Sequence, residues 1–282
     1  MKKILSGLLY LALVIVLAVM GSTFGIIGGI LGALAGIAVI IVVKRAIVLY
    51  AIGQFKYNAG DSAEAYKWMK RAFNTTKLAP SLSLLYAYMM IRDGMLDEAE
   101  AVINKVTYLG ARELTDTDLM NAKLNKSIIQ WKKGSLGEAI DTLEEAYEDG
   151  LKSTTLYGTL GYFYILDNRY QKALEFNKEA YEYNSDNTVI LDNLGASYIA
   201  STEFENADEI YSKLFEKKPE FIEPYYNYGT LMVKRGRYDI AKTYFEKALE
   251  YPEKYLSTIT HDQIKQAIDS MGVYTDGENS EE

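Results

Sequence analysis

The sequence predicts an all-α protein, with a transmembrane helical hairpin at its amino end, an α-solenoid of about six helix pairs, and a C-terminal capping helix. Three observations lead to this prediction. Two long runs near the start of the 282-residue chain contain no charged residue, an alanine recurs at a nearly constant spacing, and a short amphipathic stretch follows its last recurrence. Long uncharged runs are typical of membrane spans, and a fixed period is typical of solenoids.

Residues 1–45 form the predicted hairpin. Its spans are residues 4–20 and 26–43, separated by the short break GSTFG, and the only cations of this segment are Lys2, Lys3, Lys44 and Arg45. The positive-inside rule places both ends of such a hairpin in the cytoplasm. A cleaved signal peptide is the alternative for residues 1–20, although the residues around Met20 fit a cleavage site poorly. On either account the chain contacts the lipid bilayer through residues 4–43, at the cell membrane, and the solenoid is cytoplasmic.

The second span carries a stripe of small residues, Gly28, Gly32 and Gly36. Small residues four apart let helices approach closely in lipid. We expect the stripe to pack against the first span, and homo-oligomerisation is the alternative. Between Gly36 and Gly53 there is neither glycine nor proline, so one unbroken helix from Ile26 to Tyr57 is expected to join the second span to the first helix of the solenoid.

The solenoid prediction depends on one recurring alanine. It occupies positions separated by 34, 40, 34, 34 and 34 residues, namely Ala65, Ala99, Ala139, Ala173, Ala207 and Ala241. Twelve residues before each lies a small residue: Gly53, Ala87, Ser127, Gly161, Gly195 and Gly229. This spacing predicts two helices per repeat that cross closely at small side chains.

A predicted turn position lies five residues before each alanine. It holds Gly60, Gly94, Gly134, Asn168, Thr202 and Gly236. Glycine and asparagine tolerate the left-handed conformation that ends a helix, whereas the β-branched Thr202 fits it poorly. We therefore expect a tight left-handed turn between the two helices of each repeat.

The repeat resembles the tetratricopeptide repeat, a helix-turn-helix of about 34 residues. The unit 188–221 shows this most clearly, with Leu191, Leu194, Gly195, Tyr198, Ala207, Tyr211 and Pro219 in register. The resemblance covers residues 46–255, as units 46–79, 80–113, 120–153, 154–187, 188–221 and 222–255. It implies an α-solenoid that binds proteins through its concave face.

Two segments depart from the period. The longer step of 40 residues reflects an insertion at residues 111–119, where Thr115 and Thr117 suit a polar loop or an extended helix start. After the last repeat, residues 256–272 are expected to form the capping helix, in which Thr260 and Gln263 form a capping box. Residues 273–282 are expected to be an acidic disordered tail.

The resemblance also implies which residues face a bound peptide or helix. Carried over position by position, the peptide-binding groove holds Tyr88, Trp131, Tyr162, Ile165, Asn193, Ile199, Tyr226 and Asn227. Asn193 and Asn227 match an asparagine that in related repeats bonds a peptide backbone. The lysine-rich clamp for acidic carboxyl-terminal tails is missing, because Leu84, Leu124, Gly158, Asp192 and Tyr226 occupy its positions. An apolar or amphipathic protein segment is the expected partner.

Composition excludes several other functions. No acidic residue precedes residue 46, so residues 46–282 carry 26 basic and 38 acidic residues, a net charge of −12. Such a body repels nucleic acid, which is not expected as a partner. The chain has no cysteine and a single histidine, and no nucleophile, metal set or phosphate loop assembles in it. We expect no cofactor, no metal and no enzymatic activity, and the alternative to a binding scaffold is a structural or assembly subunit of a membrane complex.

Overall fold

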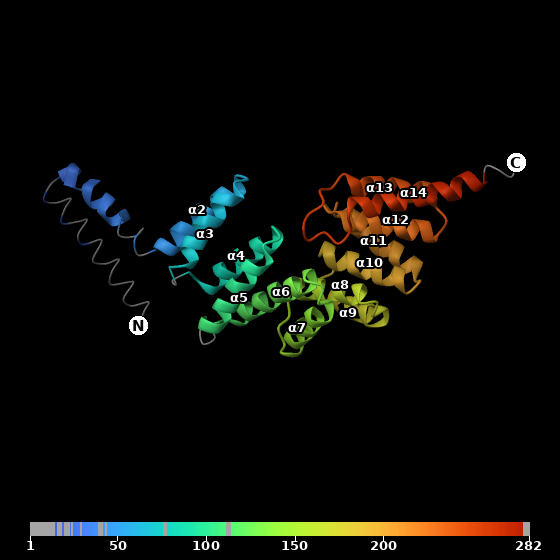
Figure 1. Cartoon of the computed structure of the whole chain (residues 1–282), viewed down its shortest axis with the longest axis horizontal. Helices are drawn as coiled ribbons and strands as arrows, with labels where there is room; N and C mark the ends of the chain where they lie inside the picture. The colour runs from blue at the N-terminus through green and yellow to red at the C-terminus, as the bar shows by residue number, and fades with distance from the viewer. Residues whose placement is uncertain are drawn as a thin grey trace. The chain divides into compact units, whose positions relative to one another are not determined.

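The computed structural model describes residues 15, 19, 23, 25–28, 30–38, 42, 44–75, 78–110 and 114–278, and these residues form helices, turns and loops without a strand (Figure 1). The helices that run from residue 45 onward are α2 (Arg45–Asn58), α3 (Ser62–Phe73), α4 (Pro80–Arg92), α5 (Leu96–Gly110), α6 (Asp116–Lys132), α7 (Leu136–Glu148), α8 (Thr154–Leu166), α9 (Tyr170–Tyr183), α10 (Thr188–Ala200), α11 (Phe204–Glu216), α12 (Ile222–Lys234), α13 (Tyr238–Leu249) and α14 (His261–Glu278). The chain divides into two compact units, Met1–Leu82 and Ser83–Glu282. The prediction of an all-α solenoid is confirmed.

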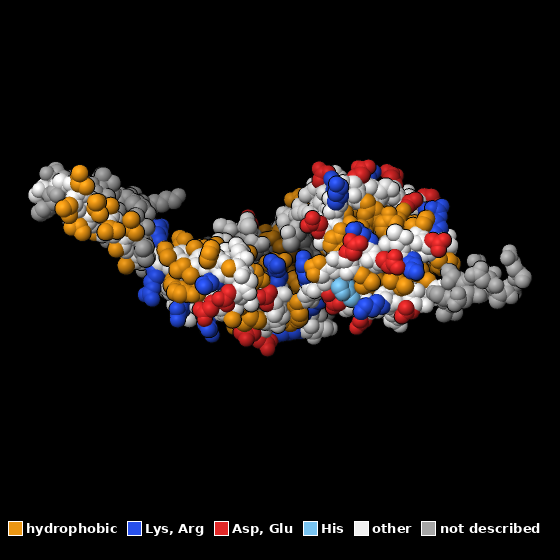
Figure 2. Space-filling model, turned by 90° about the horizontal axis from the view of Figure 1, so that it is seen from above, with side chains coloured by type: hydrophobic (Ala, Val, Ile, Leu, Met, Phe, Trp, Pro, Cys, Tyr) orange, Lys and Arg blue, Asp and Glu red, His pale blue; other side chains and the backbone are white. Residues whose placement is uncertain are grey.

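Within the first unit, residues 25–28 and 30–38 are helical. Large apolar side chains are exposed along this segment, including Ile26 at 84% and Ile27 at 72% exposure, and Figure 2 shows its described part as a largely hydrophobic surface. Gly28, Gly32 and Gly36 are buried, whereas Gly25 and Ala33 are exposed.

The predicted transmembrane hairpin is not supported within the described residues. Of the first span, residues 4–20, only Ile15 and Val19 are described. No helix built from the described residues combines the length and the apolar character that crossing a bilayer requires.

The expected helix from Ile26 to Tyr57 is interrupted at Lys44. This residue has φ −99° and ψ 20°, and α2 begins after it at Arg45. Its carbonyl accepts the first hydrogen bond of α2, from the N–H of Val48 at 3.1 Å, so Lys44 takes the N-cap position of a new helix. The prediction of an unbroken helix is therefore wrong at this residue. Neither glycine nor proline marks the break, so the sequence carries no signal for it.

Each repeat consists of two helices that cross at a small side chain. The recurring alanines Ala65, Ala99, Ala139, Ala173, Ala207 and Ala241 all have 0% exposure. At four of the six small positions the residue is glycine, and the second helix presses against it. A Cβ at Gly53 would lie 2.6 Å from Met69 Cγ, one at Gly195 2.6 Å from Tyr211 Cε2, and one at Gly229 2.7 Å from Phe245 Cδ1. The predicted close crossing is confirmed, because no side chain larger than hydrogen fits at these glycines.

The turns between paired helices adopt the predicted left-handed conformation. All six turn positions have positive φ, including Asn168 at 58° and Thr202 at 60°. At Thr202 the N–H bonds to Ile199 O and the next N–H, of Glu203, bonds to Tyr198 O, which is the Schellman arrangement. The repeat thus imposes this backbone even on a β-branched residue.

The described part of the insertion, residues 114–119, enters helix α6 at Asp116. α5 has 15 residues and α6 has 17, whereas most paired helices of the solenoid have 12–14. α6 starts at a capping box, in which Asp118 N–H donates to Thr115 Oγ1 and Thr115 N–H donates to Asp118 Oδ2. The insertion therefore produces an extended helix start, one of the two expected outcomes.

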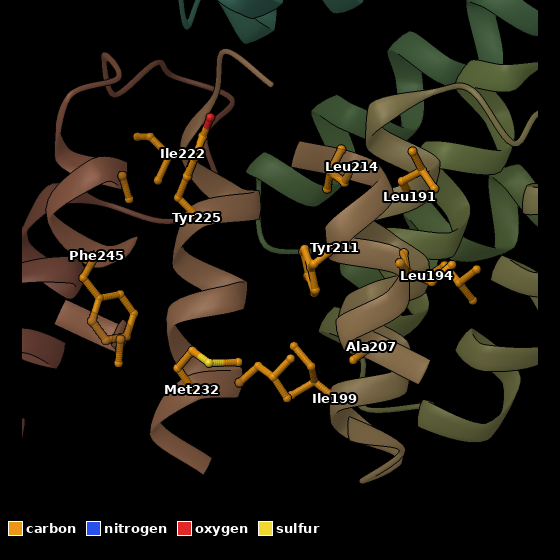
Figure 3. Close-up of a cluster of buried hydrophobic side chains, with 14 of the residues drawn as sticks. Leu191, Leu194, Ile199, Ala207, Tyr211, Leu214, Ile222, Tyr225, Met232 and Phe245 are labelled. Carbon is orange, nitrogen blue, oxygen red and sulfur yellow. The ribbon is translucent and has the colours of Figure 1, made fainter. Parts of the chain in front are cut away.

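In the second unit the repeats stack so that their first helices form one row. α6 contacts α8, α8 contacts α10, and α10 contacts α12. Apolar clusters lie between these helices and their partners, one spanning α6 to α10 and another spanning α9 to α14. Figure 3 shows how side chains of α10, α11, α12 and α13 meet in the second of them. Tyr211, Leu214 and Ile222 are at most 1% exposed there. The row of first helices is the face on which the groove was expected.

The carboxyl-terminal helix differs in extent from the prediction. α14 starts at His261 rather than at residue 256, because residues 250–260 form a loop. In this loop the N–H of Lys254 donates to Ser257 Oγ and the N–H of Thr258 donates to Glu223 Oε1. The expected capping box is present, since Thr260 N–H donates to Gln263 Oε1 and Gln263 N–H donates to Thr260 Oγ1. Ile264 and Met271 cover the end of the core with 0% and 5% exposure. α14 continues to Glu278, into the tail predicted to be disordered, because no proline stops it and each added residue gains a helical hydrogen bond.

Candidate functional site

A cavity of about 350 Å³ opens on the row of first helices in the second unit. Its walls come from α6, α8, α10, the start of α12 and the loop between α13 and α14, residues 250–260. The lining residues are Ile128, Trp131, Thr154, Thr155, Gly158, Thr159, Tyr162, Phe163, Asn187, Val189, Asp192, Asn193, Phe221, Glu223, Leu256 and Thr258. The cavity is therefore built from consecutive repeats and closed on one side by a segment that follows the last repeat.

One wall of the cavity is aromatic. The ring of Trp131 on α6 packs edge-on against Tyr162 of α8, with centroids 6.4 Å apart, and lies 5.6 Å from Phe163. Burial raises the pKa of the Tyr162 hydroxyl, and a hydrogen bond with Thr258 of the loop opposes that rise in part. Tyr162 therefore remains a neutral phenol that can donate a hydrogen bond.

The other side of the cavity carries a buried carboxylate. Asp192 on α10 is only 5% exposed. Its Oδ1 accepts hydrogen bonds from the Tyr211 hydroxyl at 3.0 Å and from Asn227 Nδ2 at 3.1 Å. Burial raises the pKa of Asp192 to about 7, and the charge of nearby Glu223 adds to the rise, while the hydrogen bonds oppose it. Desolvation is the leading cause of the raised pKa. The two hydrogen-bond donors offset it only in part, since both are neutral.

The loop between α13 and α14 is attached to the cavity through Glu223. Both the N–H and the hydroxyl of Thr258 donate to Glu223 Oε1, at 2.9 and 3.0 Å. Earlier in the same loop, the ring of Tyr255 lies against Gly94, where an added Cβ would come within 3.2 Å of its Cε2. The loop thus reaches from the end of the sixth repeat to the turn of the second one, across the face that holds the cavity.

A lysine of α6 lies beside this loop. Lys132 Nζ is 4.2 Å from the centroid of the Trp131 ring and 5.2 Å from that of Tyr255. Burial lowers the pKa of Lys132, and the negative charge of Glu223 opposes that change. The ammonium group is therefore held between two aromatic faces at the rim, in the field of a carboxylate.

The structure brings together only part of the predicted groove. Trp131, Tyr162 and Asn193 line the cavity. Asn227 lies behind the lining, where it contacts Asp192. Ile199 is 7% exposed within the core cluster, and Tyr226 packs on Phe245 with ring centroids 5.4 Å apart. Ile165 packs partly buried against the core, and Tyr88 is 37% exposed; both lie outside the lining.

The predicted asparagines have partners within the solenoid. Asn193 Nδ2 donates to Gly158 O of the preceding repeat at 2.7 Å, and Asn125 Nδ2 donates to the equivalent Leu84 O at 2.9 Å. Asn227 stands at the same repeat position and donates to the Asp192 side chain. These amide groups join neighbouring first helices, a role that the sequence analysis did not anticipate.

Glu223, Leu256 and Thr258 are cavity residues that the sequence analysis missed. Glu223 occupies the first turn of α12, and the other two belong to a loop with no repeat register. The run Leu256–Ser257–Thr258 carries no periodic signal. The hydrogen bonds from Thr258 to Glu223 hold this part of the loop at the cavity.

Comparison with known proteins supports the tetratricopeptide resemblance. Residues 222–255 match the family model described as tetratricopeptide repeat. The structure is similar to a tetratricopeptide repeat protein from Parabacteroides merdae, with a TM-score of 0.62, 12% identity, and coverage of 92% of this chain and 97% of that one. It is also similar to PilF of Pseudomonas aeruginosa, with a TM-score of 0.57, 14% identity, and coverage of 73% and 91%. No curated protein matches the sequence.

The raised pKa of Asp192 predicts a pH-dependent difference in stability between the protein and Asp192→Asn. The ordinary pKa of 3.8 applies to the unfolded chain, whereas burial raises that of the folded protein to about 7. The folded state therefore binds this proton more tightly, and the stability that the protonated group confers is lost as the pH rises through about 7. The variant has no such proton to lose.

We expect the free energy of unfolding of Asp192→Asn, relative to the parent, to increase between about pH 4 and 7 by at most about 1.4 kcal/mol per pH unit. Urea unfolding of both proteins across this range measures the difference. Other titrating groups, such as Glu179, are common to both proteins and cancel. A difference that is constant or decreases with pH would contradict the assignment.

Proposed function

Because the chain carries a tetratricopeptide-like fold, we propose that it is a protein–protein interaction scaffold that binds an apolar or amphipathic segment of a partner in the cavity on α6, α8, α10 and α12. The proposal assigns it a binding role rather than a catalytic one. The observation that carries it is the aromatic wall of Trp131, Tyr162 and Phe163 beside open volume.

The cavity has the composition of a recognition site. Trp131 and Tyr162 are only half-buried, so a partner that covers them removes further apolar surface from water. Each Å² of apolar surface removed stabilises the complex by about 25 cal/mol. Tryptophan and tyrosine are the residues that most often dominate binding energy at protein interfaces. Thr154, Thr155 and Thr159 add hydroxyl groups along the same lining, which suit the polar backbone of a peptide or the rim of a bound helix.

We further propose that residues 4–43 tether this scaffold to the cell membrane, with the solenoid in the cytoplasm. The support comes from the two uncharged runs and the cations at their ends. Exposed Ile26, Ile27 and Leu34, at 84%, 72% and 58%, add support, because a contiguous apolar surface of this kind favours a lipid or protein environment over water.

A structural subunit of a membrane complex is the second candidate. The observation in its favour is the stripe of small residues at Gly28, Gly32 and Gly36, which would suit helix association in lipid. These glycines are already buried in the single chain, which favours packing within the chain over contact between copies. We therefore place the binding scaffold first.

Photocrosslinking tests the groove. With p-benzoylphenylalanine in place of Tyr162, which lines the cavity, we expect capture of a protein partner in cells. The same group at Tyr170, which is 42% exposed on α9 outside the lining, serves as the control. Adding Trp131→Ala to the Tyr162 protein should lower capture about tenfold, because an aromatic anchor is lost. Equal capture from both positions would rule out the cavity as the binding site.

Cysteine labelling tests the tether and its orientation. The natural chain has no cysteine, so Glu216→Cys, on the exposed end of α11, gives one reporter. We expect a membrane-impermeant maleimide to label it only after the cells are permeabilised, and the protein to stay in the membrane pellet through carbonate extraction. Labelling of intact cells, or release by carbonate, would show that the proposed orientation or tether is wrong.

A further inference from the structure

We propose that the cavity selects a partner segment that carries a lysine or arginine side chain, whose stem packs on the aromatic wall and whose cationic end meets Asp192 and Glu223. This inference rests on the proposed function and specifies the chemistry of its partner. It depends on three observations: the charges that line the cavity, the surroundings of Asp192, and the contacts of Lys132.

The lining itself is acidic, and the nearest cation described, Lys132, lies outside it at the rim, where it feels the charge of Glu223. The lining includes the carboxylates of Asp192 and Glu223, and none of the described residues that line it is lysine, arginine or histidine. The charge of Glu223 acts on the titration of Asp192, so the two carboxylates share one electrostatic environment. An acidic partner group would therefore be repelled there, while a cation would be attracted.

Asp192 has the surroundings of a receptor for a cation. Its carboxylate is almost completely buried, and the hydrogen bonds that hold it come from a phenol and an amide, both at Oδ1. No described residue forms an ion pair with Asp192 or with Glu223, although ion pairs are frequent elsewhere on the described solenoid. A buried carboxylate without a countercharge is costly to ionise, and a bound cation would supply that countercharge.

The rim already holds one cation in the manner proposed. Lys132 Nζ stands over the rings of Trp131 and Tyr255, and its pKa responds to Glu223. Trp131 therefore has one face engaged by a lysine while its ring also lines the cavity. Inside the cavity, a partner lysine or arginine would make the same two kinds of contact, one with an aromatic ring and one with a carboxylate.

A purely structural role for Asp192 is the competing explanation, in which the carboxylate only holds Tyr211 and Asn227 in place. Asp192→Asn separates the two explanations. The asparagine retains an oxygen that can accept both hydrogen bonds, and loses the charge. Glu223→Gln likewise retains an acceptor for Thr258 and serves as a second variant if the first one folds poorly.

The test selects peptides from a random 12-residue display library against the full chain in detergent, and measures their affinity by fluorescence anisotropy. We expect the selected peptides to contain a lysine or arginine between apolar residues. Acetylating that lysine, or replacing that arginine by citrulline, should weaken binding to the parent at least tenfold. The same change should weaken binding to Asp192→Asn or Glu223→Gln markedly less. The exposed-site variant Glu216→Gln should behave as the parent.

The outcomes distinguish this inference from the proposed function. Neutral or acidic peptides that lose affinity for Trp131→Ala would overturn the cation inference and leave the groove intact. The same conclusion would follow if peptides that depend on Trp131 bound Asp192→Asn and Glu223→Gln with unchanged affinity. Peptides whose affinity Trp131→Ala leaves unchanged, or a selection that yields none, would overturn both.

Discussion

The close crossing of the two helices in each repeat is the constraint on which the rest of the solenoid depends. At the crossing the recurring alanine of the second helix is completely buried, and at four repeats the first helix presents a glycine with no room for a Cβ. Such an approach excludes branched or long side chains on both sides, so the spacing of small residues determines which faces of the helices meet. The stacking of repeats, and hence the row of first helices, follows from that pairing.

The same crossing positions the cavity. In the fifth repeat the ring of Tyr211 packs directly on Gly195, and its hydroxyl donates to Asp192 at 3.0 Å. Tyr211 thus fills the helix crossing with its ring and bonds the buried carboxylate of Asp192 through its hydroxyl. The orientation of the carboxylate toward the cavity is therefore a consequence of core packing rather than of a separate surface arrangement, which makes the site rigid and its electrostatics sensitive to the fold.

The features that could be predicted from the sequence are those set by local periodicity. The alanine period located the helix pairs, and the turn position predicted positive φ even at Thr202, where the residue type argues against it. The break at Lys44 could not be predicted, because it carries no breaking residue. Of the residues predicted to face a partner, Trp131, Tyr162 and Asn193 line the cavity, and Asn193 also donates a hydrogen bond to Gly158 O of the preceding repeat, whereas Ile199 lies in the core. Glu223 and Thr258 meet only through a contact 35 residues apart in the chain, which no periodic pattern encodes.

The direct measurement of the central claim is the free energy of unfolding of Gly195→Ala compared with Gly137→Ala. Both glycines lie in helices, but a Cβ at Gly195 would come within 2.6 Å of the Tyr211 ring, whereas nothing lies within 4 Å of one at Gly137. Alanine favours a helix interior over glycine by up to about 1 kcal/mol, an effect that would stabilise Gly195→Ala in the middle of α10 and is smaller for Gly137→Ala in the first turn of α7. If the close crossing is the controlling constraint, Gly195→Ala lowers the free energy of unfolding by about 1–3 kcal/mol through overpacking, while Gly137→Ala does not lower it. Equal effects of the two substitutions would contradict it.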